Sequence, residues 1–375
     1  MHIAHVFNMA NNGYQIVKAL RRYTNIDADL IIDSGDFGMG LPIWEDYQLN
    51  VDPYHVDPNI FERLKMPTWV KLFQRSRFSL SFGQIAHLFR MVKEYDLLHL
   101  HPFSPVSLQF QRTPFVIHDA GWLRTLPFDE TNTGRLGRRA YAKAESIVMT
   151  NPDLYRFLPS LKPRSEVFIP FIIDTEQYRP RPIDRDSDRL LFFSPARHNW
   201  DIKGNDRLIR AFAKYVRAGR KRTMLALVNW GSPEDITRSR QLIIDLNIDR
   251  NVEWLSPLSK PSLIDMYNKA DAVFDQFVIG GYGTTAPEAM ACERPVVICF
   301  LPYWNIRCYG EIAPVLSACT ADEIYSKMVE LEDPEVRTSY GKAGREYVLR
   351  HHDAIKLAEK YASFYRILGE HLHAG

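Results

Sequence analysis

The sequence predicts an α/β fold made of two doubly wound, Rossmann-like domains in tandem, and three observations support this prediction. Short apolar runs alternate with helical patterns along all 375 residues. A chain of this length forms two domains with separate cores more readily than one. A polar stretch at 174–189, DTEQYRPRPIDRDSDR, divides the alternation into two series, and its charges and prolines are typical of a linker.

The first half of the chain has the pattern of a parallel sheet with helices between its strands. Its apolar runs are short, bounded by polar residues and separated by stretches of helical periodicity. The expected strands are 2–7, 28–33, 97–100, 115–118, 146–150 and 166–170, and the expected helices are 14–22, 82–94 and 133–143. Residues 1–175 therefore form the first predicted domain.

The same alternation begins again after the polar stretch. The expected strands are 190–195, 223–229, 252–255, 271–277 and 295–300. Helical patterns cover about 205–218, about 234–246 and about 334–370. Residues 176–355 form the second predicted domain.

Composition and charge argue against several classes of protein. The formal net charge of +2 does not suggest a nucleic-acid-binding protein. No apolar run approaches the roughly 20 residues that span a bilayer, and the first residues lack the pattern of a signal peptide. The four cysteines include no CxxC pair, so we expect thiols in a reducing compartment, a cytoplasmic location and no zinc site.

Residues 61–95 are rich in basic and aromatic side chains, and two interpretations of this segment stay open. It could rest on an anionic membrane at the inner face or admit a lipid-linked acceptor. The alternative is that it forms the solvated face of a helix with an ordinary apolar side. The residues concerned are Lys65, Trp69, Lys71, Phe73, Arg75, Arg77 and Phe78.

The loops after the strands are where doubly wound sheets bind ligands. In FFSPARHNWDIKGN, at 192–205, Arg197 and Lys203 follow a predicted strand. Two cations in such a loop could bind a diphosphate, because charge-assisted hydrogen bonds contribute about 1.5–3 kcal/mol each. Surface loops also carry Arg and Lys that bind no ligand, so the pair by itself does not establish a diphosphate site.

A second loop, GGYGTTAPEAMA at 280–291, leads from glycines into a short helix. The glycines let backbone N–H groups approach a ligand closely, and the helix start favours an anion. Glu288 could accept hydrogen bonds from the two hydroxyls of a ribose. The alternative is that Glu288 only stabilises the helix dipole, by about 0.3–1 kcal/mol.

These residues resemble the donor-binding domain of retaining GT-B glycosyltransferases, in particular family 4. GGYGTTAPEAMACERPVV is similar to that family's pattern E-G-F-G-x-x-x-x-E-A-M-A-C-G-x-P-V-V. YDLLHLHPFSP, PFVIHDAG and FIPFIIDTEQYRP resemble its first domain and linker, and RHNWDIKGNDRLIRAF and LIDMYNKADAVFD its second. The resemblance implies two domains facing an interdomain cleft, with the last helix, about 356–375, packed back on the first domain.

The resemblance also implies roles for single residues. Glu288 matches the Glu that holds the ribose of a nucleotide sugar, and Arg197 and Lys203 match the cations that neutralise its diphosphate, at a spacing one residue longer than usual. His118 matches the His that approaches the donor sugar, and Gly13 the glycine that lets the first domain come near the phosphates.

Other positions follow from the same resemblance. Asp119 is expected to support the loop after His118, and His99 and His101 to be structural. The backbone amides expected around the donor sugar and phosphate belong to Gly281, Tyr282, Gly283, Thr284 and Thr285.

Gly280 departs from the family pattern, which has its first Glu at this position. Either Asp275 or Gln276 takes over the contact with the transferred sugar, or the glycine enlarges the pocket for a bulkier donor.

The function implied is that of a retaining, metal-independent hexosyltransferase without a cofactor. It would move a sugar from a UDP- or GDP-linked donor to a hydroxyl of a carbohydrate or lipid-linked acceptor, in glycan or glycolipid synthesis. Gly280 motivates an alternative, a sugar-nucleotide-binding protein with impaired catalysis. The sequence shows no clear signature of a GT-B epimerase or phosphorylase, and no GxGxxG of a dinucleotide-dependent enzyme follows the first strand.

Overall fold

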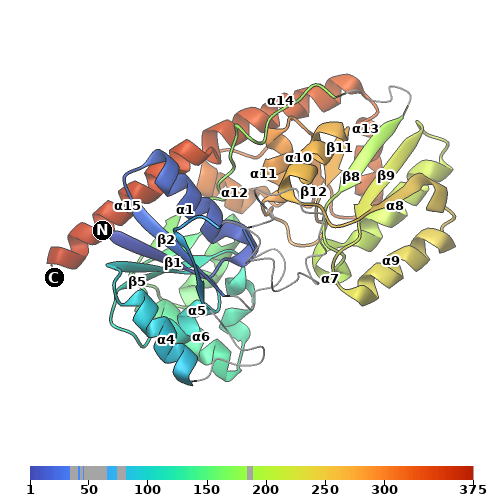
Figure 1. The fold of residues 1–375 in the computed structure, drawn as a ribbon. Coiled ribbons are helices and arrows are strands. Elements are labelled where there is room, and N and C mark those ends of the chain that lie inside the picture. The colour runs from blue at the N-terminus through green and yellow to red at the C-terminus, as the bar shows by residue number, and fades with distance from the viewer. Residues whose placement is uncertain (34–40, 43–44, 46–65, 74–81, 184–188, 375) are drawn as a thin grey trace. The chain divides into compact units, whose positions relative to one another are not determined.

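The computed structural model describes residues 1–33, 41–42, 45, 66–73, 82–183 and 189–374. The chain divides into two compact units (Figure 1). Unit 1 comprises Met1–Trp44, Pro53–Ile172 and Ala354–Gly375, and unit 2 comprises Glu45–Asp52 and Ile173–Asp353. Each unit contains one parallel β-sheet, which is the fold class that the sequence predicts.

The sheet of unit 1 has seven strands in the order β3-β2-β1-β4-β5-β6-β7. The chain moves outward in one direction from β1 and then in the other from β4, so the strand order reverses between them. The strands are β1 (His2–Val6), β2 (Asp27–Asp33), β3 (Val70–Phe73), β4 (Leu97–Leu100), β5 (Phe115–Asp119), β6 (Ile147–Met149) and β7 (Glu166–Phe168).

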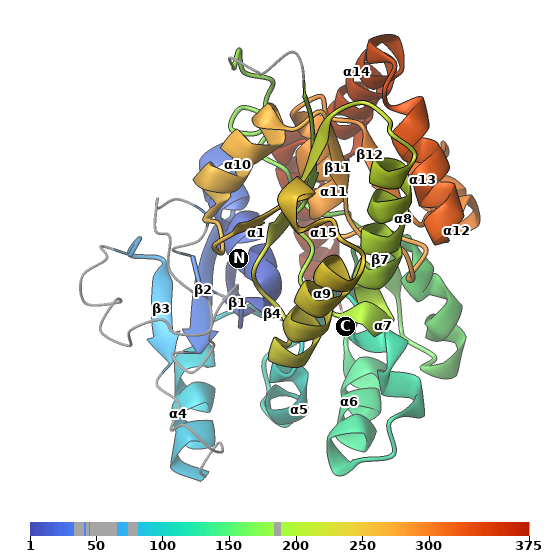
Figure 2. The same ribbon diagram turned by 90° about the vertical axis from the view of Figure 1, so that its right-hand side faces the viewer.

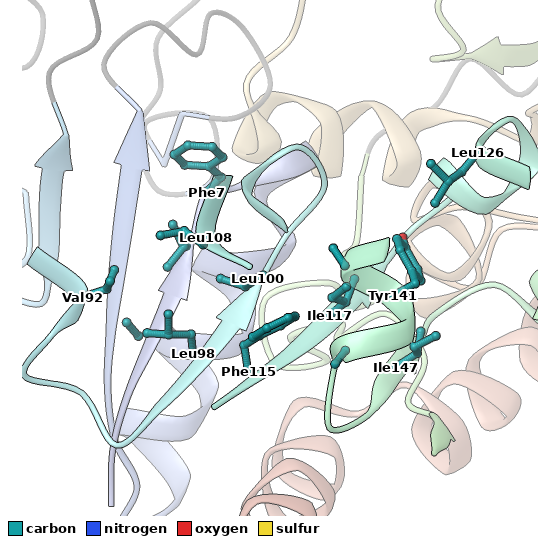
Figure 3. Close-up of a cluster of buried hydrophobic side chains, with 14 of the residues drawn as sticks. Phe7, Val92, Leu98, Leu100, Leu108, Phe115, Ile117, Leu126, Tyr141 and Ile147 are labelled. Atoms are coloured by element: carbon teal, nitrogen blue, oxygen red, sulfur yellow. The ribbon is translucent and has the colours of Figure 1, made fainter. Parts of the chain in front are cut away.

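Helices cover both faces of this sheet, and each face has its own apolar core. On one face, Leu98, Leu100 and Ile117 pack with Leu108 and Tyr141 (Figure 3). The helices of this face include α4 (Phe82–Val92), α5 (Ser104–Leu108) and α6 (Asn132–Lys143), and those of the other face are α1 (Asn12–Tyr23) and α15 (Ala354–Ala374). Because both faces are covered, the central strands are buried along most of their length instead of alternating between buried and exposed residues, and polar side chains such as His5, His99 and His118 are buried with the apolar ones.

The described part of 61–95 is not one helix, which corrects one of its two sequence interpretations. Val70–Phe73 is the edge strand β3, which lies beside β2 (Figure 2). Lys71 forms an ion pair with Asp29 at 2.6 Å and Phe73 is fully buried, so these side chains have contacts inside unit 1. Lys65, Arg75, Arg77 and Phe78 lie outside the described residues.

The sheet of unit 2 has six parallel strands in the order β10-β9-β8-β11-β12-β13. The strands are β8 (Leu190–Ser194), β9 (Thr223–Val228), β10 (Val252–Leu255), β11 (Ala272–Phe274), β12 (Val296–Ile298) and β13 (Leu316–Ser317). The α-helices are α7 (Trp200–Lys203), α8 (Asn205–Arg217), α9 (Pro233–Asp245), α10 (Lys260–Lys269), α11 (Thr285–Ala291), α12 (Pro302–Tyr309), α13 (Ala321–Glu330) and α14 (Pro334–His351). Among the described helices, none is long and apolar enough to cross a membrane.

Residues 174–183 pack on unit 2, so the prediction of a linker is wrong for this part of 174–189. Tyr178 is buried in a core cluster of unit 2, and its carbonyl accepts a hydrogen bond from Arg345 at 3.1 Å. The backbone N–H of Arg181 donates to Asn268 at 2.8 Å. One buried aromatic residue and several hydrogen bonds thus attach a segment whose composition is polar.

A disulfide joins Cys299 to Cys319, so the expectation that all four cysteines are thiols is wrong. Cys299 follows β12 and Cys319 follows β13, and the two strands are neighbours in the sheet. Cys292 is a buried thiol, and burial raises its pKa to about 12. Parallel pairing thus brings together two cysteines that are 20 residues apart in the sequence.

The disulfide predicts the number of thiols and part of the stability. In denatured, unreduced protein, two of the four cysteines should react with a thiol reagent, and all four should react after reduction. Cys319→Ser should lower the free energy of unfolding by about 3 kcal/mol, because the loop that the bond closes then gains freedom in the unfolded chain. Urea denaturation measures this change. Cys308→Ser, which leaves the disulfide in place, is the control and should change it little.

Candidate donor site in unit 2 and buried histidines in unit 1

The glycine loop of unit 2 runs from the end of β11 to the start of α11 and is held by Gln276. The side-chain amide of Gln276 donates to the carbonyls of Gly281 at 2.6 Å and of Cys299 at 2.9 Å. Its oxygen accepts from the N–H groups of Val278 at 2.9 Å and of Ile279 at 2.6 Å. The sequence analysis offered Gln276 as a sugar contact, but its buried amide is occupied in shaping the loop.

Gly280 has a left-handed backbone with φ of +82°, which L-residues rarely adopt. A Cβ at this position would lie 2.7 Å from Cδ1 of Leu301, whose N–H donates to the carbonyl of Gly280 at 2.9 Å. The space where a side chain would begin is therefore filled by an apolar residue. The expectation of an enlarged pocket is wrong at this point of the loop.

Lys203 and Asp275 form an ion pair beside the glycine loop. The ammonium of Lys203 lies 3.2 Å from Oδ1 of Asp275, and the carbonyl of Lys203 accepts from the N–H of Phe277 at 2.9 Å. Asp275 is buried, and its Oδ2 has no hydrogen-bond partner among the described residues. A buried carboxylate oxygen without a partner carries a desolvation cost, so Asp275 stays a candidate contact for a ligand.

Arg197 lies in the same loop, before α7, and its side chain is exposed. Within the described ranges, no hydrogen bond or ion pair involves its guanidinium. Asn205 donates to its carbonyl at 3.3 Å, which attaches the loop to the start of α8. Arg197 is thus an available cation on a fixed backbone.

Glu288 is a buried carboxylate held by two side chains of α10. Lys260 donates to Oε1 and the hydroxyl of Tyr267 donates to Oε2 at 3.0 Å. Burial opposes the charge of Lys260, but attraction to Glu288 and Glu45 raises the pKa of the amine. Because the carboxylate has further lone pairs, it can still accept hydrogen bonds from a ligand.

The sequence reasoning missed both partners of Glu288. Tyr267 stands in LIDMYNKADAVFD, which was quoted only for its resemblance, and Lys260 carried no signal. Glu288 therefore does more than stabilise the helix dipole, because two specific donors orient its carboxylate.

The remaining residues of the loop have separate environments. The hydroxyl of Tyr282 lies 2.9 Å from that of Tyr347, so this side chain belongs to the core and only its backbone is left for a ligand. Gly283 has open space where a Cβ would stand. The side chains of Thr284 and Thr285 at the start of α11 and the backbone of Gly281 are half-buried.

In unit 1, the side chain of His118 is buried near the carboxyl end of β5. Neither ring nitrogen has a hydrogen-bond partner among the described residues, and burial lowers the pKa of His118 to about 3. It lines a small hollow together with Asn12, Gln15, Ile16, Thr150, Pro170, Phe171, Ile172 and Tyr361. The ring is therefore neutral and can offer one donor and one acceptor.

Asp119 and Gly13 of unit 1 have clear structural roles. The carboxylate of Asp119 accepts from the N–H of Gly121 at 2.6 Å and from the hydroxyl of Tyr141, which are contacts of a residue that supports the loop. A Cβ on Gly13 would lie 2.9 Å from the carbonyl oxygen of Phe7 and 3.1 Å from Nε2 of His101. No side chain fits there, so packing alone requires a glycine at position 13.

The buried histidines predict that the protein loses stability in mild acid. Burial lowers the pKa to about 3 for His5 and His118, to about 4 for His198, and well below the ordinary value of 6.5 for His99 and His101. Between pH 6.5 and those values the unfolded chain binds more protons than the folded chain. The free energy of unfolding should therefore be constant above about pH 7 and fall with increasing steepness below pH 6.5.

Urea denaturation at several pH values between 5 and 8 measures this dependence. His118→Gln should make it shallower, whereas His87→Gln, a change at an exposed position, should leave it unaltered. Constant stability from pH 8 to pH 5 would contradict the assignment of neutral buried histidines.

Alanine substitutions at two glycines of the loop should have different effects on the free energy of unfolding. Gly280→Ala should lower the free energy of unfolding by about 1–2 kcal/mol, because it places a side chain in the left-handed region and against Leu301. Gly283→Ala is the matched control, since its backbone is not left-handed and a Cβ there meets no atom within 4 Å. Thermal and urea denaturation of both variants give the comparison, and equal effects would contradict the described geometry.

Comparison with known proteins bears first on unit 2. Residues 175–300 match the family described as glycosyl transferases group 1. Over 158 residues the chain is 30% identical to D-inositol 3-phosphate glycosyltransferase of Saccharomonospora viridis, and this alignment covers 40% of the chain and 36% of the relative. The chain spans between 33% and 41% of the length of the curated relatives it matches.

Solved structures are similar to this chain over nearly its whole length. HepE (Alr3699) of Anabaena, in complex with UDP and glucose, matches with a TM-score of 0.75 and 16% identity over 98% of this chain and 99% of that one. Sucrose-phosphate synthase of Thermosynechococcus elongatus matches with a TM-score of 0.70 and 17% identity over 98% of this chain and 99% of that one. The chain therefore has the GT-B fold, and its residues 175–300 are similar to the glycosyl transferases group 1 family.

Proposed function

We propose that the protein is a hexosyltransferase that moves a sugar, with retention, from a nucleotide-diphosphate sugar to a hydroxyl acceptor. The observation that carries this proposal is the oriented carboxylate of Glu288 in the same unit as the Lys203–Asp275 pair and the glycine loop. The S. viridis relative is named a glycosyltransferase, and the HepE structure contains UDP and glucose. These names favour a UDP-linked donor over a GDP-linked one.

The nucleotide would be held through its ribose by Glu288. Lys260 and Tyr267 hold the carboxylate in place, so it needs no rearrangement to accept hydrogen bonds from two hydroxyl groups. The half-buried backbone of Gly281, Gly283 and the following threonines would surround the diphosphate and the sugar.

The diphosphate would be neutralised by Arg197 and Lys203. When the bond between sugar and phosphate breaks, negative charge develops on the leaving phosphate, and fixed cations at that place stabilise the transition state. Lys203 is already oriented by Asp275, and Arg197 is an available cation on the same loop. This scheme calls for no metal ion, because two side-chain cations supply the positive charge.

His118 would contact the donor sugar as a neutral ring. Its pKa of about 3 means that it offers hydrogen bonds and no positive charge at neutral pH. In a same-face reaction the departing phosphate oxygen takes the proton of the acceptor hydroxyl, so the imidazole need not act as a base. The acceptor would be a carbohydrate or a lipid-linked sugar, and the reaction a step of glycan or glycolipid synthesis.

Leu301 favours a second candidate function, a sugar-nucleotide-binding protein with impaired catalysis. It fills the space beside Gly280, where the resembled family has a carboxylate that contacts the transferred sugar. Asp275, with one unpartnered oxygen, is the residue that would replace that carboxylate if catalysis persists.

The two candidates are separated by measuring binding and turnover on the same preparation. The protein is incubated with UDP and GDP sugars and with mono-, oligo- and lipid-linked saccharides, while release of nucleoside diphosphate and the shift in melting temperature are recorded. A transferase should show both a shift and sugar transfer. A shift without transfer or hydrolysis would support the binding protein, and no shift with any nucleotide would contradict both.

Arg197→Ala tests the diphosphate contact. Transfer should fall about 100-fold, because one charge-assisted contact to the developing anion is lost. Stability should not change, since no described contact of the guanidinium is removed. Arg210→Ala, an exposed arginine of α8, is the matched control and should keep full turnover. Equal turnover of the two variants would show that Arg197 does not contact the donor.

A further inference from the structure

Phe277 is the residue at which the glycine loop meets the loop that carries Lys203. Its N–H donates to the carbonyl of Lys203 at 2.9 Å. Gly204 has a left-handed backbone with φ of +65°, and a Cβ on it would lie 3.2 Å from Cβ of Phe277 and 3.2 Å from Cγ2 of Val278. The two loops are therefore in direct contact, and a group that holds the backbone of Phe277 also fixes its position relative to Lys203.

Arg207, in the first turn of α8, binds the carbonyl group of Phe277. Its Nη1 lies 2.6 Å from the carbonyl oxygen of Phe277 and 2.7 Å from that of Cys319. Nη1 carries two hydrogens, so a single guanidinium group donates to both carbonyls. The backbone of Phe277 is thus held on both sides, by Lys203 at its N–H and by Arg207 at its carbonyl.

The second acceptor of Arg207 belongs to the disulfide that also supports the loop. Cys319 is joined to Cys299, whose carbonyl accepts from the side chain of Gln276 at 2.9 Å and whose N–H donates to the carbonyl of Gln276 at 2.8 Å. Two consecutive loop residues, Gln276 and Phe277, are therefore connected to the two ends of one covalent bond. Gln276 in turn orients the next N–H groups of the loop.

The stability of α8 does not explain an arginine at position 207. The positive end of the helix dipole opposes a cation in the first turn. Within the described part of the chain Arg207 forms no ion pair with a carboxylate, whereas Lys203 pairs with Asp275. Its half-buried guanidinium is held by carbonyl groups. Residues that depart from a local stability rule in this way are most often found at functional sites.

We propose that Arg207 is a positioning residue of the donor site. It holds the start of the glycine loop against Lys203, so the backbone N–H groups of the loop and the ammonium stay in place for the diphosphate. Arg207 acts through Phe277 and needs no contact with the donor. This role rests on the proposed function, and neither the sequence analysis nor the family resemblance assigned a role to Arg207.

Arg345 of α14 makes similar hydrogen bonds in another part of unit 2. It donates to the carbonyls of Tyr178 at 3.1 Å and of Ala291 at 2.5 Å. These contacts attach residues 174–183 and the end of α11 to α14, and neither acceptor lies in the loop from Gln276 to Gly283. Arg345 is therefore a matched control for an arginine that supports the fold without holding the loop.

The first test measures hydrogen exchange of the loop by mass spectrometry of peptides that cover 275–283. The N–H groups of Phe277, Val278 and Ile279 should exchange about 10-fold faster in Arg207→Gln, because local opening of the loop then breaks fewer hydrogen bonds. Arg207→Lys keeps the charge but not the planar fork, so it should restore only part of the protection. Exchange in β9 is the internal reference and should not change.

The second test measures UDP binding to the same proteins by calorimetry. The affinity should fall about 10-fold in Arg207→Gln, because the loop must be ordered again when the nucleotide binds. It should recover in part in Arg207→Lys. Arg210→Gln, which changes an exposed arginine of the same helix, should bind UDP like the wild type. Arg345→Gln should lower the free energy of unfolding without changing exchange of the loop.

Equal exchange of the loop in folded Arg207→Gln and in the wild type would overturn the proposal. Faster exchange of the same size in Arg345→Gln would also overturn it, because the effect would then follow from general destabilisation. If Arg207→Gln does not fold, Arg207→Lys decides the case, and exchange and UDP affinity equal to those of the wild type would contradict the proposal. A wild type that binds no nucleoside diphosphate would contradict the proposed function, while the exchange measurement still decides whether Arg207 holds the loop.

Discussion

Parallel strands place all their carboxyl ends on one edge of a sheet, and this constraint determines where polar residues collect in both units. In unit 1 it brings His5, His99 and His118 together from three adjacent strands. In unit 2 it brings the loop after β8, with Lys203, next to the loop after β11, with Asp275. The interiors of both sheets are apolar on each face, so these edges are where the chain can place buried polar chemistry.

Buried polar groups in this protein are of two kinds, and the difference separates structural residues from candidate ligand contacts. Gln276 makes four hydrogen bonds, and both oxygens of Glu288 have donors, so these side chains are held in place before any ligand arrives. Oδ2 of Asp275 and nitrogens of His99 and His118 have no partner among the described residues. A buried group with hydrogen-bond partners fixes the conformation around it. A buried group without partners has an unfavourable desolvation free energy, which a ligand that supplies the hydrogen bond can remove.

Most strands were predictable because a strand buried on both faces is a short, continuous apolar run. LLHL at 97–100 has the same bounds in the prediction and in the structure. The edge strand β3 was missed because its Lys71 and the surrounding basic and aromatic residues hide the apolar pattern. The assignment of 174–183 to a linker failed because Tyr178 alone inserts into the core of unit 2, and a window of composition does not detect one anchoring residue.

The sequence by itself determined the alternation of strands and helices, the loops that carry Arg197, Lys203 and Glu288, and the absence of a carboxylate at position 280. Periodicity and local turn chemistry carry that information, because they act between residues close in the chain. Tertiary structure decided the pairing of Lys260 with Glu288, the place of Leu301 against Gly280, the disulfide and the packing of the buried histidines of unit 1. Each depends on which strands and helices become neighbours, and residues distant in sequence meet only when the sheets assemble.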